Sequence, residues 1–372
     1  MPEKTVMPKK EVKLDVTDIE NFVYDMKRCI KCAGCKWVEH TYMPGINFSM
    51  RCPSAQKFLY DTYGAYGRLR VALSMLEDKV GYSDKLVDLI YKCQMCGACD
   101  VACKIVSDRD PLEIMRELRA QCVEDSQILP AHLVTIEGLR KEDNMLGEPK
   151  TERGRWAKGL AVKDLTKESA EVAYHVGCRY SYDEELQPIA RATVSLLNKA
   201  GVDVGIMGKD EICCGGRAYE MGFQGEFIKY AESNIEAWTT AGVKTVITSC
   251  SDGFGTFKEL YPRVGKEIDF EFLHITEFLA QLITEGRIKL DKRVPMLVTY
   301  HDPCHLSRFT EPFIPMPGKE HKAFGQAFVH EAPKVPRSKG VYEAPRYILK
   351  SIPGLKLVEM ERIKEYLSLI HI

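Results

Sequence analysis

The sequence predicts an α-helical N-terminal module followed by an α/β region of two related halves, the second of them incomplete. Over residues 26–125, cysteine motifs alternate with apolar residues at helical spacing. From residue 171 onward, short apolar strands alternate with helices, which is the order of a largely parallel sheet. The tract from Tyr174 to Cys178 returns from Tyr300 to Cys304, which indicates an internal repeat. We therefore expect an N-terminal arm at 1–25, a helical module at 26–125, a linker at 126–170, a first repeat at 171–290 and a truncated second repeat at 291–372.

Composition narrows the class of protein. The 372 residues are 45% hydrophobic, so the fourteen cysteines are not needed as disulfide staples for a small core. The N-terminal MPEKTVMPKKEVKLD lacks the pattern of a secretory signal, which favours a reducing compartment where clustered thiols bind metal or carry out redox chemistry. A net charge of −1 with mixed signs argues against a nucleic-acid partner. The longest apolar runs fall short of the roughly 20 residues that span a bilayer. We expect a cytoplasmic protein with no direct membrane span, or one held at a membrane through a partner.

The helical module contains three clear helix patterns. AYGRLRVALSMLEDKV and SDKLVDLIYKC place apolar residues three and four apart, and DPLEIMRELRAQCV begins with Asp-Pro, a typical helix start. Residues 126–170 are charged and poor in aromatic and β-branched residues, which indicates a linker or surface excursion.

The α/β region begins with EVAYHVG, a predicted strand, and continues with a helix in EELQPIARATVSLLNKAG that ends at Gly201. VDVGIMG is a second strand, FIKYAESNIEAWTTAG a helix closed by Gly242, and VKTVITSC a buried strand. GLKLVEM repeats the pattern of the second strand later in the chain.

Two cysteine triplets dominate the helical module. The C-x2-C-x2-C-x3-C spacing from residue 93 to 103 is typical of two-cluster ferredoxins, in which the fourth cysteine serves the other cluster. Residues 29 to 35 supply a second triplet, with its fourth member displaced to Cys52 before Pro53. A zinc-stabilised scaffold is the alternative, although zinc sites use two separated pairs. Exchange of fourth ligands predicts two [4Fe-4S] clusters, one on Cys29, Cys32, Cys35 and Cys103, the other on Cys93, Cys96, Cys99 and Cys52.

Five further cysteines lie in the α/β region. Cys213 and Cys214 are adjacent and precede Gly215-Gly216, which lets the backbone approach a bulky inorganic group. Cys178, Cys213-Cys214-Gly215 and Cys250 together resemble the cysteine-rich CCG domain of heterodisulfide reductase catalytic subunits and related iron-sulfur oxidoreductases. The resemblance covers about residues 26–368 and implies a two-cluster ferredoxin-like domain followed by a CCG region of two pseudo-repeats. It implies a third iron-sulfur cluster on Cys178, Cys213, Cys214 and Cys250, with Cys304 as the first metal ligand of a second motif.

Two departures from the family pattern affect the expected chemistry. The closing C-x-x-C of the first motif reads Cys250-Ser251-Asp252-Gly253, so its last thiolate is missing. Four ligands suit an ordinary four-iron cluster better than the non-cubane cluster that splits a disulfide in the family. The final YLSLIHI replaces the expected continuation into a second CCG motif, so we expect the C-terminus to be truncated by a foreign tail.

The resemblance implies an oxidoreductase subunit of an anaerobic redox complex, which passes electrons between a flavin-bearing or other redox partner and a disulfide or other two-electron acceptor. The first alternative is the electron-accepting iron-sulfur subunit of a glycerol-3-phosphate or 2-hydroxy acid dehydrogenase. The second is a non-catalytic electron-transfer module of a larger reductase such as a benzoyl-CoA reductase complex. No Walker or G-x-G-x-x-G pattern supports a nucleotide or flavin site in the chain itself.

The remaining candidates have competing interpretations. His175 and His301 precede motif cysteines and either contact cluster sulfurs or stabilise a turn. His305 and Arg308 follow Cys304 in a loop suited to an anionic substrate, although we expect Arg308 to be a solvated surface residue. Cys122 belongs to no motif and is expected to pack in a core.

Overall fold

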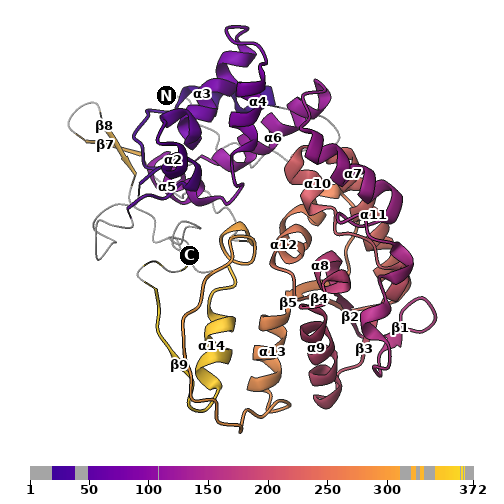
Figure 1. Ribbon diagram of the computed structural model, residues 1–372. Coiled ribbons are helices and arrows are strands. Elements are labelled where there is room, and N and C mark those ends of the chain that lie inside the picture. Colours follow the sequence, from indigo (N-terminus) through magenta and orange to yellow (C-terminus); the bar gives the residue numbers. More distant parts are fainter. Residues whose placement is uncertain are drawn as a thin grey trace.

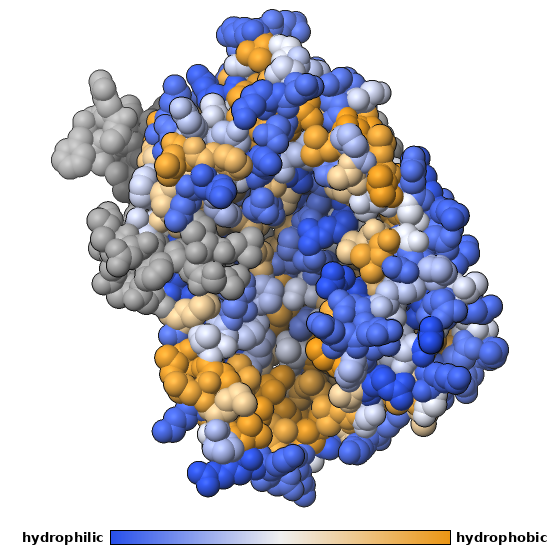
Figure 2. All heavy atoms as spheres, in the orientation of Figure 1, coloured by the Kyte–Doolittle hydropathy of each residue, from blue (hydrophilic) through white to orange (hydrophobic). Residues whose placement is uncertain are grey.

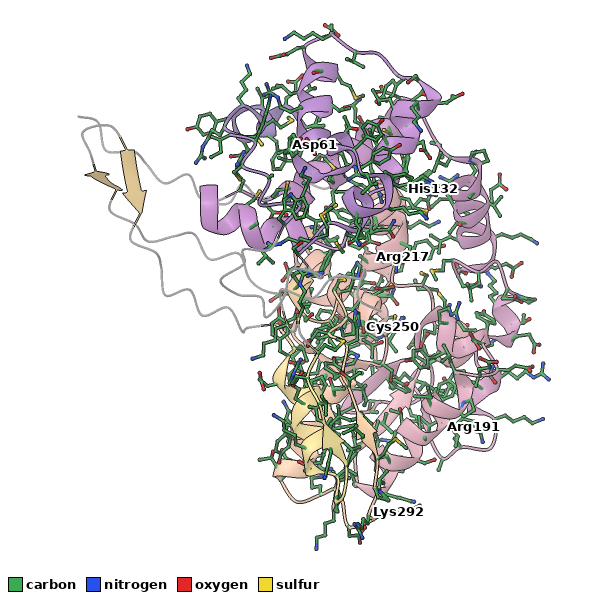
Figure 3. The ribbon with its side chains drawn as sticks, turned by 60° about the vertical axis from the view of Figure 1, so that its left-hand side comes forward. Asp61, His132, Arg191, Arg217, Cys250 and Lys292 are labelled. Carbon is green, nitrogen blue, oxygen red and sulfur yellow. The ribbon has the colours of Figure 1, made fainter. Side chains whose placement is uncertain are left out.

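The chain forms a helical module at one end and an α/β lobe at the other (Figure 1). This computed structural model describes residues 19–37, 49–107, 109–310, 320–323, 327–330, 340–360, 362 and 364. The expected C-terminal tail at 366–372 and residues 1–18 of the expected arm lie outside the described residues. In a view turned by 60°, Cys250 and Arg217 lie near the middle of the molecule, between Asp61 in the helical module and Lys292 at the far end (Figure 3).

The three predicted helices of the N-terminal module are confirmed. Ser83 caps one of them by accepting a hydrogen bond from the Leu86 amide, and Asp110 caps another, with Pro111 in its first turn. Apolar residues from these helices, such as Leu69, Ile90 and Ile114, form one buried core. The elements are η1 (Ile19–Phe22), α1 (Val23–Lys27), α2 (Pro53–Phe58), η4 (Asp61–Tyr63), α3 (Ala65–Leu76), α4 (Asp84–Tyr91), α5 (Ala98–Ser107) and α6 (Pro111–Glu124).

The segment at 126–170, expected to be a linker, is built into the α/β lobe. Ile136 and Leu139 are buried in a cluster that also contains Cys178 and Cys213. Leu133, Ile136 and Leu139 are spaced as on one face of a helix, but the partners of this face lie far along the chain, so the charged composition concealed the packing. The elements here are α7 (Pro130–Glu142), η5 (Lys150–Glu152), η6 (Arg155–Ala157) and β1 (Lys163–Asp164), which joins the sheet beside β3 (Val204–Ile206).

The predicted α/β order is confirmed by a five-stranded parallel sheet with strand order β1-β3-β2-β4-β5. Helices cover both faces, because Val246 and Ile247 of β4 pack into different cores, with Trp238 on one side and Val194 on the other. Beyond the strands already given, the elements are β2 (Val172–His175), α8 (Gly177–Tyr182), α9 (Gln187–Lys199), η7 (Gly208–Asp210), α10 (Gly216–Met221), α11 (Gln224–Thr240), β4 (Thr245–Thr248), α12 (Ser251–Gly255), η8 (Thr256–Leu260), η9 (Tyr261–Val264), β5 (Glu271–His274) and α13 (Ile275–Thr284).

The last part of the chain does not add to this sheet in the described residues. Its strands β6 (Leu297–Val298) and β9 (Lys356–Leu357) form a separate parallel pair, and β7 (Glu320–Ala323) and β8 (Ala327–His330) an antiparallel pair. Between them lie η10 (Arg308–Thr310) and α14 (Glu343–Ser351), which contacts α13. Apolar side chains gather on the surface over α13 and α14 (Figure 2), and Leu297 of β6 is 69% exposed. Among the described residues, no helix combines the length and the apolar character needed to cross a bilayer.

Helix α6 docks the helical module on the α/β lobe. Arg119 donates a hydrogen bond of 2.8 Å to the carbonyl of Glu220 on α10. Glu113 receives both guanidinium nitrogens of Arg263 at 3.0 Å. Gly222, with φ of +99°, closes α10 so near to α6 that a Cβ there would lie 2.3 Å from the Arg119 carbonyl oxygen. The docking therefore requires glycine at 222 for both conformation and space.

We expect Gly222→Ala to destabilise the protein by more than about 1–2 kcal/mol, because the left-handed backbone alone costs that much for a residue with a Cβ and the clash with α6 adds to it. Thermal unfolding of anaerobically prepared protein measures the loss. Gly225→Ala is the matched control, since a Cβ at 225 in α11 meets nothing within 4 Å. Equal melting temperatures for the two variants would contradict the close approach of α10 to α6.

Candidate functional site

The first cysteine triplet lies in the loop after α1. Cys32 is exposed, Cys29 is half-buried and Cys35 is buried. Burial, and then the charges of Cys52, Cys29 and Cys32, raise the pKa of Cys35 to about 11. On α5, burial raises the pKa of Cys103, and the charges of Cys35 and Cys32 raise it further. The fold thus brings Cys103 near the first triplet, and its charge also acts on Cys99 of the second, so the assignment of Cys103 to one cluster stays a prediction.

The second triplet begins in the loop between α4 and α5, and its last member, Cys99, lies in the first turn of α5. Met95 and Gly97 in this loop have positive φ, which turns the backbone tightly between Cys93, Cys96 and Cys99. Cys52, the residue before α2, is close enough for the charge of Cys93 to raise its pKa after burial. Burial raises the pKa of Cys96 to about 12, and it also raises that of Cys99 well above its ordinary value.

These raised pKa values test whether the thiols fit an iron-sulfur cluster. All fourteen cysteines carry free thiols, so none is committed to a disulfide. Metal ligation needs thiolates, and buried thiols that repel one another become thiolates only beside a strong positive charge. Metal ions supply that charge, so the thiol sets suit a metal cluster. Within the part of the chain that the structure describes, no three His, Cys, Asp or Glu side chains form a group that could hold a metal ion as they stand.

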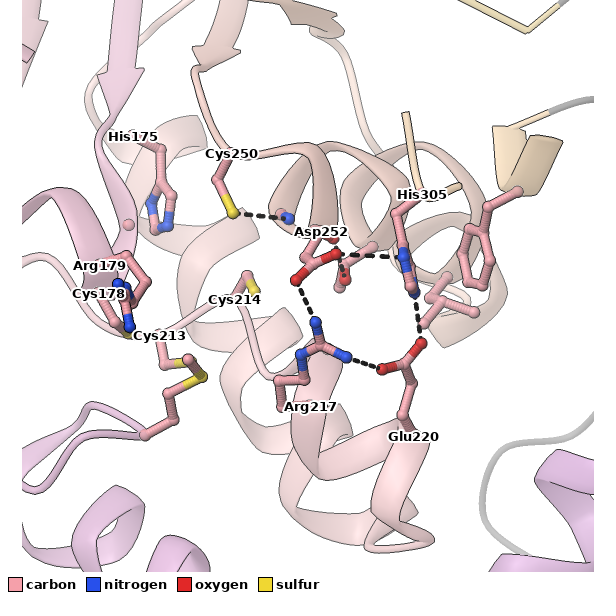
Figure 4. Close-up of a pocket in the computed structure, with 17 residues that line it drawn as sticks. His175, Cys178, Arg179, Cys213, Cys214, Arg217, Glu220, Cys250, Asp252 and His305 are labelled. Atoms are coloured by element: carbon pink, nitrogen blue, oxygen red, sulfur yellow. Dashed lines mark hydrogen bonds and ion pairs between the residues drawn. The ribbon is translucent and has the colours of Figure 1, made fainter. Parts of the chain in front are cut away.

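Four cysteines of the α/β lobe face one pocket at the carboxyl ends of β2 and β4 (Figure 4). Cys178 lies in the first turn of α8, Cys213 and Cys214 precede α10, and Cys250 is the residue before α12, where its Sγ accepts a hydrogen bond of 3.4 Å from the Gly253 amide. The hollow between these thiols is partly open to solvent. This space and four convergent thiols fit a polynuclear cluster.

A buried ion pair supports the Cys178 end of the pocket. Arg153, fully buried, donates to Glu211 at 2.8 and 3.2 Å and lies 3.6 Å from the Cys178 Sγ. The other acceptor sites of Glu211 bind the amides of Val176 and Gly177 at 3.0 and 2.9 Å. Sequence reasoning missed both residues, because a single Arg and a single Glu 58 positions apart have no motif.

His175 lines the pocket and its ring is buried. It packs edge-on against Trp238 and Phe257. Its Nδ1 lies 3.8 Å from the Glu211 Oε2 and has no hydrogen-bond partner among the described residues, so the choice between a cluster contact and a stabilised turn stays open. Burial lowers the pKa of His175 to about 4, so the ring is neutral.

A charged group forms the opposite wall of the pocket (Figure 4). His305 lies 2.5 Å from Glu220 through Nε2 and 3.1 Å from Asp252 through Nδ1. Arg217 binds the same two carboxylates. Burial raises the pKa of Glu220, but the charge and hydrogen bond of His305 outweigh it and hold the pKa near 2. We expected His305 in a loop suited to an anionic substrate. Through Glu220 and Asp252 it connects the segment after Cys304 to the pocket of the first cysteine motif.

The remaining candidates fall outside the pocket. The expectation that Arg308 is a solvated surface residue is wrong, because its Nε donates to the Cys96 carbonyl at 2.9 Å and its Nη2 lies 3.4 Å from the Cys304 Sγ. Cys304 thus lies beside the second triplet. After burial, its charge is one of the effects that raise the pKa of Cys96. Cys122 packs in the helical core as predicted. His301 is half-buried, and burial lowers its pKa.

The two cysteine triplets and the four cysteines of the pocket all lie within segments that match known protein families. Residues 25–105 match the family model of the 4Fe-4S dicluster domain, and residues 172–258 match that of the cysteine-rich domain. The chain carries both domains. Their order is the one that the cysteine spacings predict.

Relatives of the chain are redox proteins. A dihydromethanophenazine:CoB–CoM heterodisulfide reductase component of Methanosarcina mazei is 29% identical over 97% of this chain and 81% of its own length. The EtfAB:quinone oxidoreductase of Syntrophomonas wolfei is 29% identical over 79% of this chain and 37% of its own length. A fumarate reductase (CoM/CoB) component of Methanothermobacter marburgensis is 30% identical over 73% and 46%. These oxidoreductase proteins are homologues of the chain. No solved structure matches it significantly.

We expect Glu211→Gln to lower the free energy of unfolding by about 3 kcal/mol, because it leaves the buried Arg153 charge without its partner. Urea unfolding of anaerobically prepared protein, followed by circular dichroism, measures the loss. Glu152→Gln is the matched control, since Glu152 pairs with Arg155 at the surface and such pairs contribute less than about 1 kcal/mol. A loss no larger than that of the control would contradict the supporting role of Glu211.

Proposed function

We propose that the chain is the electron-transfer subunit of an anaerobic redox complex, acting in the cytosol or at a membrane through a partner. It passes electrons between a flavin-bearing partner and a disulfide or other two-electron acceptor. The observation that carries the proposal is the arrangement of thiols in three successive groups, two in the dicluster domain and one in the pocket of the cysteine-rich domain.

The proposed ligand sets follow these groups. An iron-sulfur cluster, when bound, takes up and releases single electrons. In the pocket, the chain places Arg153 beside Cys178, where the positive charge favours the thiolate. The proposed sets are Cys29, Cys32, Cys35 and Cys103; Cys93, Cys96, Cys99 and Cys52; and Cys178, Cys213, Cys214 and Cys250, with Cys304 left for a further site.

Disulfide cleavage is the less favoured end reaction at this pocket. Position 253 faces the pocket beside Cys250, and it is glycine. Four thiols support one four-iron cluster and leave no fifth ligand. The similarity to an EtfAB:quinone oxidoreductase favours a second candidate, an electron-transfer module that passes electrons toward a quinone.

Iron and sulfide analysis with electron paramagnetic resonance tests the proposal. We expect about twelve irons per chain from three four-iron clusters, and about four fewer in Cys250→Ser. Cys122→Ser is the matched control, because Cys122 lies in the helical core and belongs to neither group of proposed ligands, so the iron content of this variant should equal that of the unaltered protein. About eight irons with no third signal would overturn the pocket cluster, and stoichiometric zinc without iron would overturn the redox function.

A further inference from the structure

We propose that Arg51, Arg119 and Arg308 raise the reduction potential of the cluster held by the second cysteine triplet, and so draw the electron to the side of the dicluster domain that faces the cysteine-rich pocket. This inference rests on the proposed function, because it requires the clusters to be present. It concerns three side chains that no cysteine motif includes.

The three guanidinium groups bind consecutive parts of one loop. Arg119 donates to the Cys93 carbonyl at 2.6 Å, Arg308 to the Cys96 carbonyl at 2.9 Å, and Arg51 to the Ala98 carbonyl at 3.2 Å. They come from three separate elements: α6, η10 and the segment before α2. Arginines so far apart in sequence meet at the carbonyls of one short loop only because the fold brings them there.

Their positive charges are weakly screened. Arg51 and Arg119 are 5% and 6% exposed, and Arg308 is half-buried. Arg362, also buried, donates to the Met50 carbonyl at 2.7 Å, and burial with the charges of Arg51 and Arg308 lowers its pKa to about 10. Charges held in a buried site act more strongly than exposed ones, because little water lies between them and the loop.

The first triplet lies in different surroundings. Cys32 and Lys31 are exposed, and Ile30 is 71% exposed. Arg109 acts on Cys103, and it donates to the carbonyl of Asp25, outside the loop. Reduction adds one negative charge to a cluster, so nearby cations and hydrogen bonds favour the reduced form. Burial of the second loop opposes reduction, and the three arginines offset that effect.

Arg308 also links this loop to the next domain. Its Nη2 lies 3.4 Å from Cys304, in the segment whose His305 binds Glu220 and Asp252 at the pocket wall. The electron that moves from the first cluster to the second leaves the first oxidised and the second reduced. A higher potential at the second loop therefore places the electron beside the cysteine-rich domain.

The test is a potentiometric titration of the full chain followed by electron paramagnetic resonance, with Cys32→Ser used to identify the signal of the first triplet. We expect Arg308→Gln to change the reduction equilibrium of the second cluster about tenfold toward the oxidised form, which is about 59 mV for one electron, and to leave the first unchanged. Arg308→Lys, which keeps the charge, should shift it less. Arg70→Gln, which removes an exposed charge from α3, is the matched control.

The iron content of the protein distinguishes failure of this inference from failure of the proposed function. A second-cluster potential that stays unchanged in fully loaded Arg308→Gln, or shifts equally at both clusters, overturns the inference alone. If Arg308→Gln loads less iron than the unaltered protein, Arg51→Gln gives the same test from the other side of the loop. An unaltered protein without iron overturns the proposed function and this inference together.

Discussion

One buried cation joins the two domains directly. The Arg119 guanidinium donates to the carbonyls of Tyr91 and Cys93 in the dicluster domain and to that of Glu220 in the cysteine-rich domain. A buried charge is costly unless its donors are satisfied, and here backbone carbonyls satisfy them on both sides of the interface. Any separation of α6 from α10 would remove one of these acceptors, the Glu220 carbonyl, from a buried charge. The distance between the second triplet and the pocket is therefore set by a polar contact in the interior.

The contact between Arg119 and Glu220 also fixes the side of the pocket that Cys213 and Cys214 form. Helix α10 follows Cys213 and Cys214 closely, so fixing Glu220 fixes the cysteine pair as well. Gly215 supports this turn with φ of +76°, and a Cβ there would lie 3.2 Å from the Cβ of Tyr230 on α11. On the outer side, His305 ties the segment after Cys304 to the same helix through Glu220. Three distant segments of the chain thus converge on α10.

How much could be predicted from the sequence differs between the thiols and their supports. The cysteine spacings predicted the order of the two domains, and the strand and helix patterns predicted the parallel sheet, because both signals are local. Arg119, Arg308 and Glu211 could not be found in this way. Each is a common surface residue type whose partner lies far along the chain, and Arg308 and Cys96 are 212 positions apart. The charged segment at 126–170 was misjudged for the same reason, since its partners in the lobe, such as Cys213 for Ile136 and Glu211 for Arg153, lie far along the chain.

The pocket has room for a fifth thiol at position 253, where the family pattern places one. A Cβ at Gly253 would lie 3.5 Å from the Cys250 Cβ, an ordinary van der Waals contact, so a side chain fits at that position. The neighbouring Asp252 is instead held by Arg217 and His305. A carboxylate engaged in two ion pairs is a fixed charge at the pocket wall, whereas a fifth thiolate would be a further iron ligand. Packing therefore permits a thiol at position 253 and the chain does not supply one, so the pocket presents four thiols and, at its wall, a carboxylate held by two ion pairs.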